Sequence, residues 1–535
     1  MPLTTGRMPA LSLFGSHSRT TAATAVRRNV AVAALLVVLA AAFLFVDRAT
    51  MPIRLWDESR NIVNALEMQR DGIGLVTTYG GAPDLWNSKP PLLIWLMVAS
   101  VDAFGPSLWA LRLPSMIAGL GTILLVFGFV RRVSGSLSTA GLSAVLMVAS
   151  PAYFGEHSTR TADYDALLLF FVTAYLFLLF LALHRPRPGW RLFAFAGVAI
   201  GCACLTKSVA ALVPGVGLGL YAVVSGRWRR VLRSPGYALT GLAVAAVVVG
   251  FVVLREVRSP GYLAAIWAND MGGRFATSLV SPKPWTYYLG LLHAGYFAAT
   301  PLLVLALPAW IFATGRQRMV LTFSLCIVVG VLVVFSFAAS KLDHYILTAV
   351  PFMAIAAAIT IHIAVDRARA ELARDGRYSG LAATVLLLTA GVPLLMGGAG
   401  AIARRYYYPP IDKGAEAGRY GALFDAIATN AGRPIMVVDP GFVSEGRPHY
   451  APTLAAYRAL WQARGVGIAH RYALDIPVST SPILLASCSS SVAIDLLRVG
   501  RDEAGVEGCA AVAVARGSAA LGRRRSALQR LASGS

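Results

Sequence analysis

The stretch Trp56-Asp57-Glu58-Ser59-Arg60 places three charged side chains between two apolar spans of the chain. Two further polar stretches follow it, Lys89-Pro90-Pro91-Leu92 and Arg112-Leu113-Pro114-Ser115. Charged side chains at a membrane boundary are costly, and they are kept there mainly for function. We therefore expect the first long loop to form an active site held at a membrane surface.

The composition sets the class of protein. Of 535 residues, 57% are hydrophobic and only 14% are charged, with a mean hydropathy of +0.64. A soluble globular protein carries roughly a quarter charged residues, so we predict a polytopic α-helical membrane protein. The net charge of +22 would suggest nucleic acid as a partner of a soluble protein. Here the arginines lie between apolar spans, where membrane topology and lipid headgroups explain them, and we expect no nucleic acid partner.

A helix that crosses a membrane needs about 20 apolar residues. The segment from Leu92 to Ala103 is too short to cross, and we expect it to lie in the membrane interface. The pair 192–209 and 210–225 is short and is compatible with a single hairpin. With that alternative open, the sequence predicts about eleven spans, near 29–46, 107–130, 136–154, 166–183, 192–209, 210–225, 236–254, 291–313, 319–338, 345–364 and 379–398.

The distribution of arginine predicts the orientation of these spans. If the tail 1–28 is cytoplasmic, the short inner connections together carry fifteen Lys and Arg residues, as the positive-inside rule expects. The first outer loop, 47–106, then faces away from the cytosol, and the membrane domain extends over 29–400. We predict a multi-pass membrane protein with its C-terminal region on the outer side.

From about residue 401 the composition becomes more polar, which predicts a small extracytoplasmic α/β domain over 401–515. Pro434 to Asp439 and Ile483 to Ala486 are typical of buried strands, and Ala451 to Ala463 is typical of a helix. Cys488 and Cys509 either pair in this domain or are unrelated thiols. The Ala/Arg/Ser-rich segment 516–535 is predicted to be a flexible tail.

Unusual polar residues collect in the loops that this topology places on the outer face, and we expect them to line one cavity. A carboxylate there would suit a general base in sugar transfer, and fixed cations would suit a departing phosphate. Several of these residues also have a purely structural explanation. Asp165 would stabilise a helix N-terminus, the lysines would lie at the protein surface, and His344 would have a structural role. The expected residues are Asp57, Glu58, Arg60, Lys89, Asp163, Asp165, Lys207, Asp270, Arg274, Lys341, His344 and Tyr345.

In order along the chain, these pieces resemble a known family. The pattern comprises Asp57-Glu58-x-Arg60, Glu67-Met68, Lys89-Pro90-Pro91-Leu92, Trp95, Arg112-Leu113-Pro114-Ser115, Asp165 before an apolar run, Leu205-Thr206-Lys207 and Lys341-x-x-x-Tyr345. It resembles the bacterial GT-C glycosyltransferases of the lipid A aminoarabinose transferase and protein O-mannosyltransferase kind over roughly residues 50–350. The chain departs from the aminoarabinose enzymes at Ser88, where they tend to carry an acid.

The resemblance implies a glycosyltransferase that moves a sugar, with inversion, from a polyprenyl phosphate carrier to a lipid, glycan or protein acceptor at the outer face of a bacterial inner membrane. Asp57 is then expected to be the catalytic base and Asp165 a second acid, with Asp163 as its competitor. Glu58, Arg112, Asp270, His344 and Tyr345 are expected around the cavity. The expected donor-phosphate contacts are Arg60, Lys89, Lys207, Arg274 and Lys341.

Two points stay open in the sequence. No His or Cys cluster predicts a tightly bound metal, although acids beside a phosphate can recruit a divalent cation. A different class of protein, a lipid or polysaccharide transporter with a charged outer cavity, is the alternative function. It is disfavoured because transporter charges are expected near the membrane midplane and in paired halves.

Overall fold

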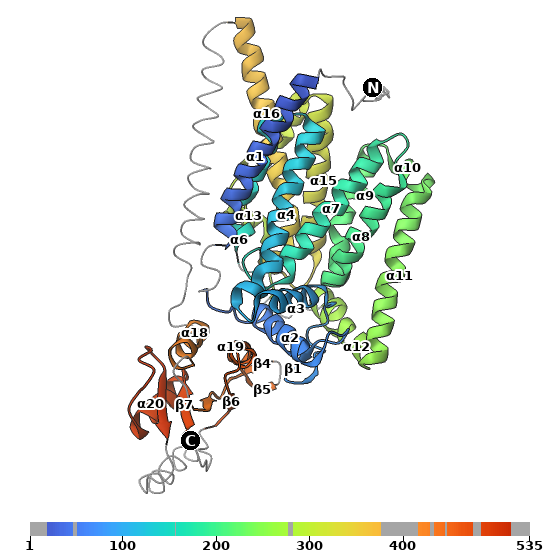
Figure 1. The fold of residues 1–535 in the computed structure, drawn as a ribbon. Helices are drawn as coiled ribbons and strands as arrows, with labels where there is room; N and C mark the ends of the chain where they lie inside the picture. Colours follow the sequence, from blue (N-terminus) through green and yellow to red (C-terminus); the bar gives the residue numbers. More distant parts are fainter. Residues whose placement is uncertain are drawn as a thin grey trace.

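The protein is described from a computed structural model, which covers residues 19–45, 51–155, 157–276, 282–375, 416–428, 433–444, 447–473 and 483–514. Long helices form a bundle, two helices lie across one end of it, and a small α/β domain follows (Figure 1). The bundle helices are α1 (Arg19–Phe45), α4 (Leu108–Ser134), α5 (Leu137–Val148), α7 (Tyr164–His184), α8 (Trp190–Lys207), α9 (Val213–Val224), α11 (Pro235–Arg258), α14 (Thr300–Phe312), α15 (Gly315–Phe337) and α16 (Val350–Asp375).

Shorter helices connect these elements. They are α6 (Pro151–Phe154), η1 (Ser208–Leu212), α10 (Trp228–Arg233), α12 (Tyr262–Ile266), η2 (Trp267–Ala276), α13 (Tyr287–His293) and η3 (Asp343–Ala349).

Within the described residues, six helical segments are long and apolar enough to cross a membrane: Leu108–Ser134, Tyr164–His184, Trp190–Val224, Pro235–Arg258, Gly315–Phe337 and Asp343–Arg367. The two predicted spans 192–209 and 210–225 fall in one of these segments, where η1 joins α8 to α9. Span 136–154 is divided into α5 and α6, and span 291–313 is covered by the end of α13 and by α14. Span 379–398 lies outside the described residues, so the total of eleven stays a prediction.

The bundle is held together by close helix packing, which small residues permit in a membrane. Helix α9 crosses α15 at Gly217 and Gly330. A Cβ atom on Gly217 would lie 2.5 Å from the Cα atom of Ile327, so the two backbones touch there. Helix α7 is apolar around most of its circumference and lies at the centre of the bundle between α4 and α8, as expected for a span surrounded by protein.

The outer layer consists of α2 (Asp57–Asp71) and α3 (Leu92–Phe104), with the short strands β1 (Thr78–Tyr79) and β2 (Ala82–Pro83) between them. Both helices lie across the end of the bundle rather than along it (Figure 1). Helix α3 begins directly after Pro90-Pro91 and buries Leu93, Ile94 and Met97 against its neighbours. The segment predicted to be too short to cross is therefore a separate helix in this layer.

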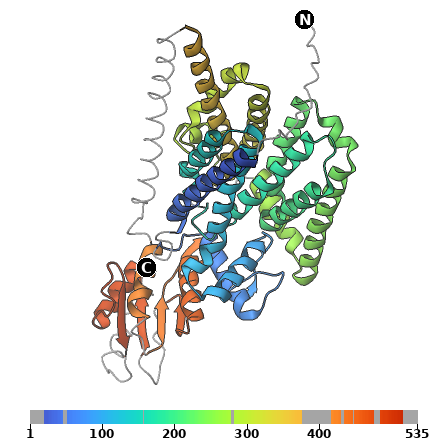
Figure 2. The same cartoon turned by 45° about the horizontal axis from the view of Figure 1, so that its top comes forward.

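The C-terminal domain contains a four-stranded sheet of order β6-β3-β7-β8, in which only the β7–β8 pairing is antiparallel (Figure 2). The three elements predicted in this region are confirmed as β3, α19 and β7, and Cys488 forms a disulfide with Cys509. The elements are α18 (Glu416–Ile427), β3 (Ile435–Val438), β4 (Phe442–Ser444), β5 (Arg447–Tyr450), α19 (Pro452–Ala463), β6 (Ile468–Arg471), β7 (Ile483–Ser487), α20 (Ser490–Val499) and β8 (Ala510–Val514).

Helix α19 packs on α2 and joins this domain to the outer layer in one hydrophobic core. Tyr457 Oη accepts a hydrogen bond from the backbone nitrogen of Ile53 at 3.0 Å, and Arg464 Nε donates to Pro106 O at 2.9 Å. The domain is therefore docked on the first loop of the chain.

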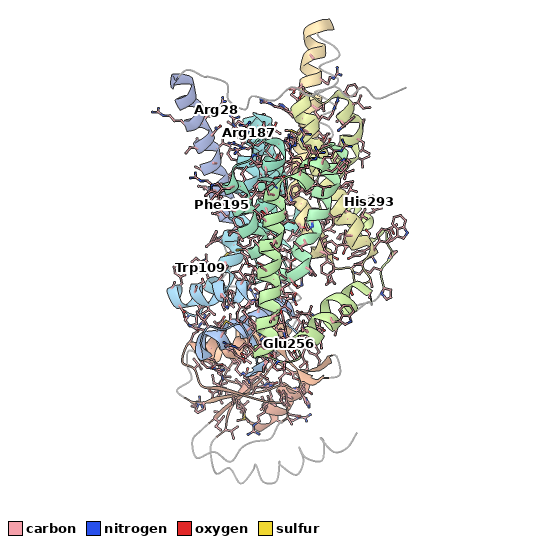
Figure 3. The ribbon with its side chains drawn as sticks, turned by 90° about the vertical axis from the view of Figure 1, so that its right-hand side faces the viewer. Arg28, Trp109, Arg187, Phe195, Glu256 and His293 are labelled. Carbon is pink, nitrogen blue, oxygen red and sulfur yellow. A yellow bond between two sulfur atoms is a disulfide. The ribbon has the colours of Figure 1, made fainter. Side chains whose placement is uncertain are left out.

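The basic connections gather at the opposite end of the bundle. Arg230 Nη1 donates to Leu183 O at 2.9 Å, and Arg131 Nε donates to Asn29 Oδ1 at 3.1 Å. In Figure 3, Arg28 and Arg187 lie near one end of the molecule and Glu256 lies toward the other. Arg28 and Arg187 thus lie at the same end of the bundle, as the sequence predicts for the inner connections, and the orientation of the protein in a membrane stays a prediction.

Candidate functional site

Asp57 is the first residue of α2, and its carboxylate lies near the end of the bundle. Its Oδ2 atom is 3.9 Å from Lys89 Nζ and 3.9 Å from His157 Nδ1. The N-terminus of a helix stabilises negative charge, and 26% of the Asp57 side chain is exposed, so the group can be reached from outside. The residue before it, Trp56, has φ 71°, which is unusual for a residue other than glycine.

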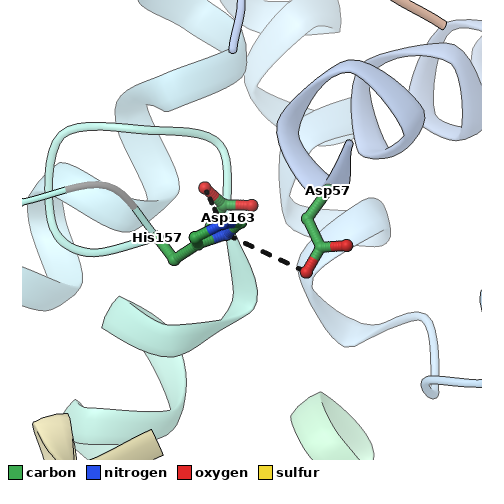
Figure 4. A group of neighbouring side chains, drawn as sticks. All are labelled: Asp57, His157 and Asp163. Carbon is green, nitrogen blue, oxygen red and sulfur yellow. Dashed lines mark ion pairs between the residues drawn. The ribbon is translucent and has the colours of Figure 1, made fainter. Parts of the chain in front are cut away.

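His157 joins Asp57 to Asp163 (Figure 4). Its Nδ1 atom is 3.6 Å from Asp163 Oδ2, which also accepts a hydrogen bond from Thr161 Oγ1 at 2.6 Å. Burial disfavours the imidazolium, but the carboxylates of Asp163 and Asp57 outweigh this effect and raise the pKa of His157 to about 9. Burial also raises the pKa of Asp163, against the influence of His157. At neutral pH we therefore expect a protonated His157 between the two acids.

The same three side chains could hold a metal ion. Asp57, His157 and Asp163 each offer a ligand atom, and these atoms lie within 4.8 Å of one another. Asp163 Oδ1 is buried and has no hydrogen-bond partner among the described residues. One imidazole nitrogen and two carboxylates suit zinc or a harder divalent cation. A bound cation would have to displace the His157 proton, so its affinity would rise with pH.

Glu58 and Arg112 form a fully buried ion pair beneath this group. Arg112 Nε lies 2.7 Å from Glu58 Oε1, and both side chains are inaccessible. Burial opposes the charge of Glu58, but Arg112 overcomes it and holds the pKa of this carboxyl below its usual value. Glu58 also accepts hydrogen bonds from the backbone nitrogens of Arg54 and Ala162. The pair therefore ties the first loop to α4 and to the loop that carries His157.

Arg60 is held by a carboxylate that the sequence analysis did not single out. Its Nε and Nη2 atoms donate to the two oxygens of Asp84 at 2.7 and 2.6 Å. Burial alone would raise the pKa of Asp84, but Arg60 lowers it below the usual value. The guanidinium also lies 4.5 Å from the centre of the Tyr79 ring and donates to Tyr450 Oη at 3.0 Å. Arg60, a residue of α2, thus links this helix to the C-terminal domain.

Lys207 and Asp165 form a third buried pair, with Nζ 2.7 Å from each carboxylate oxygen. The ring of Tyr345 lies 5.9 Å from Lys207 Nζ, and its neighbour His344 lies 4.5 Å from the ring of His157. Lys341 Nζ donates to Ala338 O at 2.7 Å. Asp163, rather than Asp165, is the acid beside Asp57.

The structure thus brings together predicted residues from four separate segments, around Asp57, Lys89, the 157–165 loop and His344. Glu58, Arg112 and Arg60 lie next to this cluster as ion pairs. The side chains of Asp270 and Arg274 lie outside the described part of the structure. No catalytic or binding role is tested by these positions, and the roles expected for them stay predictions.

Three residues at this site were missed in the sequence. His157 shares the segment His157-Ser158-Thr159-Arg160-Thr161-Ala162-Asp163 with the predicted acids, and its proximity to Asp163 was an available signal. Asp84 is an isolated acid in the first loop. Tyr450 carries no local signal, because only the tertiary fold brings it to Arg60.

Parts of the chain are similar to known proteins. Residues 88–254 match the family described as dolichyl-phosphate-mannose-protein mannosyltransferase. The undecaprenyl phosphate-alpha-4-amino-4-deoxy-L-arabinose arabinosyl transferase of Pseudomonas aeruginosa is 30% identical over 52% of this chain and 50% of its own length. A corresponding transferase of Proteus mirabilis is 26% identical over 58% of this chain and 55% of its own length.

The fold is shared over a longer stretch. The crystal structure of ArnT from Cupriavidus metallidurans bound to undecaprenyl phosphate superposes with a TM-score of 0.61 and 18% identity, covering 92% of this chain and 99% of that one. The chain therefore shares the fold of this GT-C glycosyltransferase and resembles the ArnT and protein O-mannosyltransferase group over part of its sequence. The chain spans about half the length of the curated relatives it matches, so this likeness identifies its fold, and its own activity and substrates are a separate question.

Proposed function

We propose that this GT-C protein is a glycosyltransferase that moves a sugar from a polyprenyl phosphate carrier to a lipid, glycan or protein acceptor. The observation that carries the proposal is the approach of the Asp57 carboxylate to Lys89 at the outer layer of the bundle, 3.9 Å apart. An acid that can accept a proton and a cation that can meet a phosphate are the two groups that the reaction needs.

The proposed step is a single displacement. The acceptor hydroxyl oxygen bonds to the anomeric carbon, the bond between that carbon and the phosphate oxygen breaks, and the hydroxyl proton passes to Asp57. Attack from the face opposite the phosphate inverts the anomeric centre. The leaving phosphate carries the electron pair of the broken bond, and a cation that contacts it lowers the barrier by stabilising this charge.

Lys89 is the best candidate for this contact among the described cations. Its ammonium nitrogen lies 3.9 Å from the carboxylate of Asp57, the proposed base, whereas Arg60 and Lys207 contact other carboxylates, those of Asp84 and Asp165. Lys89 directly precedes Pro90-Pro91, which fix the backbone at the start of α3. His157 and Asp163 would position Asp57, and Lys207 with Asp165 would form a wall beside Tyr345.

The proposed location is a bacterial inner membrane with the site and the C-terminal domain on the outer side. The separation of the basic loops from the site supports this orientation. A disulfide in the C-terminal domain supports it too, because disulfides persist in oxidising compartments. The family match and the relatives named above are transferases, and we do not propose the transporter alternative.

The test is transfer of a labelled sugar from purified polyprenyl-phosphate sugars in detergent, where no gradient exists. Asp57→Asn and Lys89→Ala should each lower kcat at least ~100-fold, because they remove groups that act on the transition state. Asp71→Asn, in the last turn of the same helix, and Lys283→Ala serve as matched controls and should retain full activity. Wild-type transfer by both Asp57→Asn and Lys89→Ala would refute the proposal.

A further inference from the structure

Arg255 is a buried cation that the site described above does not use. It lies in the last turn of α11, and only 2% of its surface is exposed. Among the described residues, neither terminal nitrogen of its guanidinium has a hydrogen-bond partner. Leaving a buried guanidinium without a hydrogen-bond partner is strongly unfavourable in a protein interior.

Three other buried cations of this region are compensated by carboxylates. Arg60, Arg112 and Lys207 each contact a carboxylate at 2.7 Å or less. Asp84 acts on Arg255 electrostatically, but both of its oxygens are engaged by Arg60. Within the described part of the chain, both terminal nitrogens of Arg255 are therefore available to an external anion.

The helix presents Arg255 to the inside of the molecule. The buried residues of α11 are Thr240, Val244, Phe251 and Arg255, at spacings of four and seven residues that define one helix face. The opposite face carries exposed Leu and Val side chains suited to lipid, such as Leu242 and Val249. Arg255 therefore faces the interior of the molecule at the end of the span, while the other face of α11 is suited to contact lipid.

Tyr262 connects Arg255 to the candidate site. The Arg255 guanidinium lies 5.0 Å from the centre of the Tyr262 ring, and Tyr262 Oη donates to Ser88 O at 2.6 Å. Ser88 directly precedes Lys89. Helix α12, which carries Tyr262, lies beside the lower end of α11 and next to the layer formed by α2 and α3 (Figure 1).

We propose that Arg255 binds the phosphate of a membrane lipid, and that this lipid is the polyprenyl phosphate carrier. A guanidinium matches the geometry of a phosphate with two parallel hydrogen bonds. The end of a transmembrane span is also the depth at which lipid phosphates lie. This inference rests on the proposed function, because the choice of the carrier over a bilayer phospholipid follows from the link to Lys89.

The experiment measures binding of undecaprenyl phosphate and, separately, of phosphatidylglycerol to the purified full-length protein in detergent. Arg255→Met should weaken the affinity for undecaprenyl phosphate at least ten-fold, Arg255→Lys should weaken it less, and phosphatidylglycerol binding should not change. Arg258→Met, an exposed arginine one turn further along, should bind both lipids like the wild type. In lipid-free detergent, the Tm of Arg255→Met should equal or exceed that of the wild type, because an uncompensated charge has been removed.

Several outcomes would overturn the inference. Unchanged affinity of Arg255→Met for undecaprenyl phosphate would exclude the contact, and equal weakening for both lipids would assign Arg255 to a bilayer phospholipid. A lowered Tm with unchanged lipid binding would show a packing role. Wild-type protein that binds no undecaprenyl phosphate would overturn the proposed function as well, which separates the two failures.

Discussion

Tyr450 of strand β5 accepts a hydrogen bond at 3.0 Å from Arg60 of helix α2, although the two residues are 390 positions apart in the chain. The same tyrosine ring lies 5.9 Å from Trp56, which directly precedes Asp57. The C-terminal domain thus contributes a side chain to the wall of the candidate site. It holds the start of α2 in place through these contacts.

Tyr450→Phe should lower the rate of sugar transfer several-fold while leaving the fold intact. The variant keeps the ring against Trp56 and removes a part-buried hydrogen bond to a charged group, which contributes about 1.5–3 kcal/mol. Transfer rates and Tm check this result. Tyr472→Phe, an exposed tyrosine of the same domain, is the control, and equal rates for the two variants would contradict a positioning role for Tyr450.

Glu58→Gln should destabilise the protein by about 3–5 kcal/mol, because it leaves the buried Arg112 without its ionic partner. The free energy of unfolding in a denaturing detergent titration measures this loss. Asp71→Asn is the control. It breaks the ion pair with Arg70, whose side chain is 63% exposed while that of Asp71 is 50% exposed, and such exposed pairs contribute little to the free energy of unfolding. A loss below about 1 kcal/mol for Glu58→Gln would show that water reaches Arg112.

Stability should depend on pH through His157. Its pKa is raised from 6.5 to about 9 in the folded protein, so folding favours the protonated form. The stabilisation is fully present below pH 6.5 and is lost as the pH rises through about 9. The raised pKa of Asp163 acts in the same direction, because the folded state holds this proton more tightly too, but its pH window begins lower, at the usual value of 3.8.

The check is Tm measured from pH 6 to pH 10 in the presence of a chelator. Wild-type Tm should fall across this range more than that of His157→Gln. His362→Gln, a half-buried histidine of α16 near the other end of the bundle, is the control and should follow the wild type. Parallel curves for wild type and His157→Gln would mean that the imidazole stays neutral.

Gly217→Ala should destabilise the bundle by about 1–3 kcal/mol, since its new methyl group would meet the backbone of α15 at 2.5 Å. Gly219→Ala, two residues further along α9, has open space around its Cβ position. It should be neutral or slightly stabilising, because alanine favours a helix. Unfolding in denaturing detergent compares the two, and similar effects would show that the crossing of α9 and α15 can widen.

Much of the architecture follows from composition and local pattern. Apolar windows located the described spans because a chain in hydrocarbon must satisfy its backbone hydrogen bonds within each helix. The start of α3 after Pro90-Pro91 and the strand β3 could also be predicted from the sequence, since their sequence signals are local. The division of 136–154 into two helices was not predicted, because hydropathy records burial in lipid and not where a helix stops.

For the candidate site, too, the sequence determines one part and the tertiary structure another. The sequence alone determined which segments carry charge at the outer layer, among them Asp57, Lys89 and the 157–165 loop, because a charge in apolar sequence is conspicuous wherever the chain goes. Only the tertiary structure decided which charged side chains form ion pairs. Arg60 pairs with Asp84, Lys207 with Asp165, and His157 with Asp163. Electrostatic energy depends on distance and burial, and neither quantity is fixed until helices distant in sequence pack together.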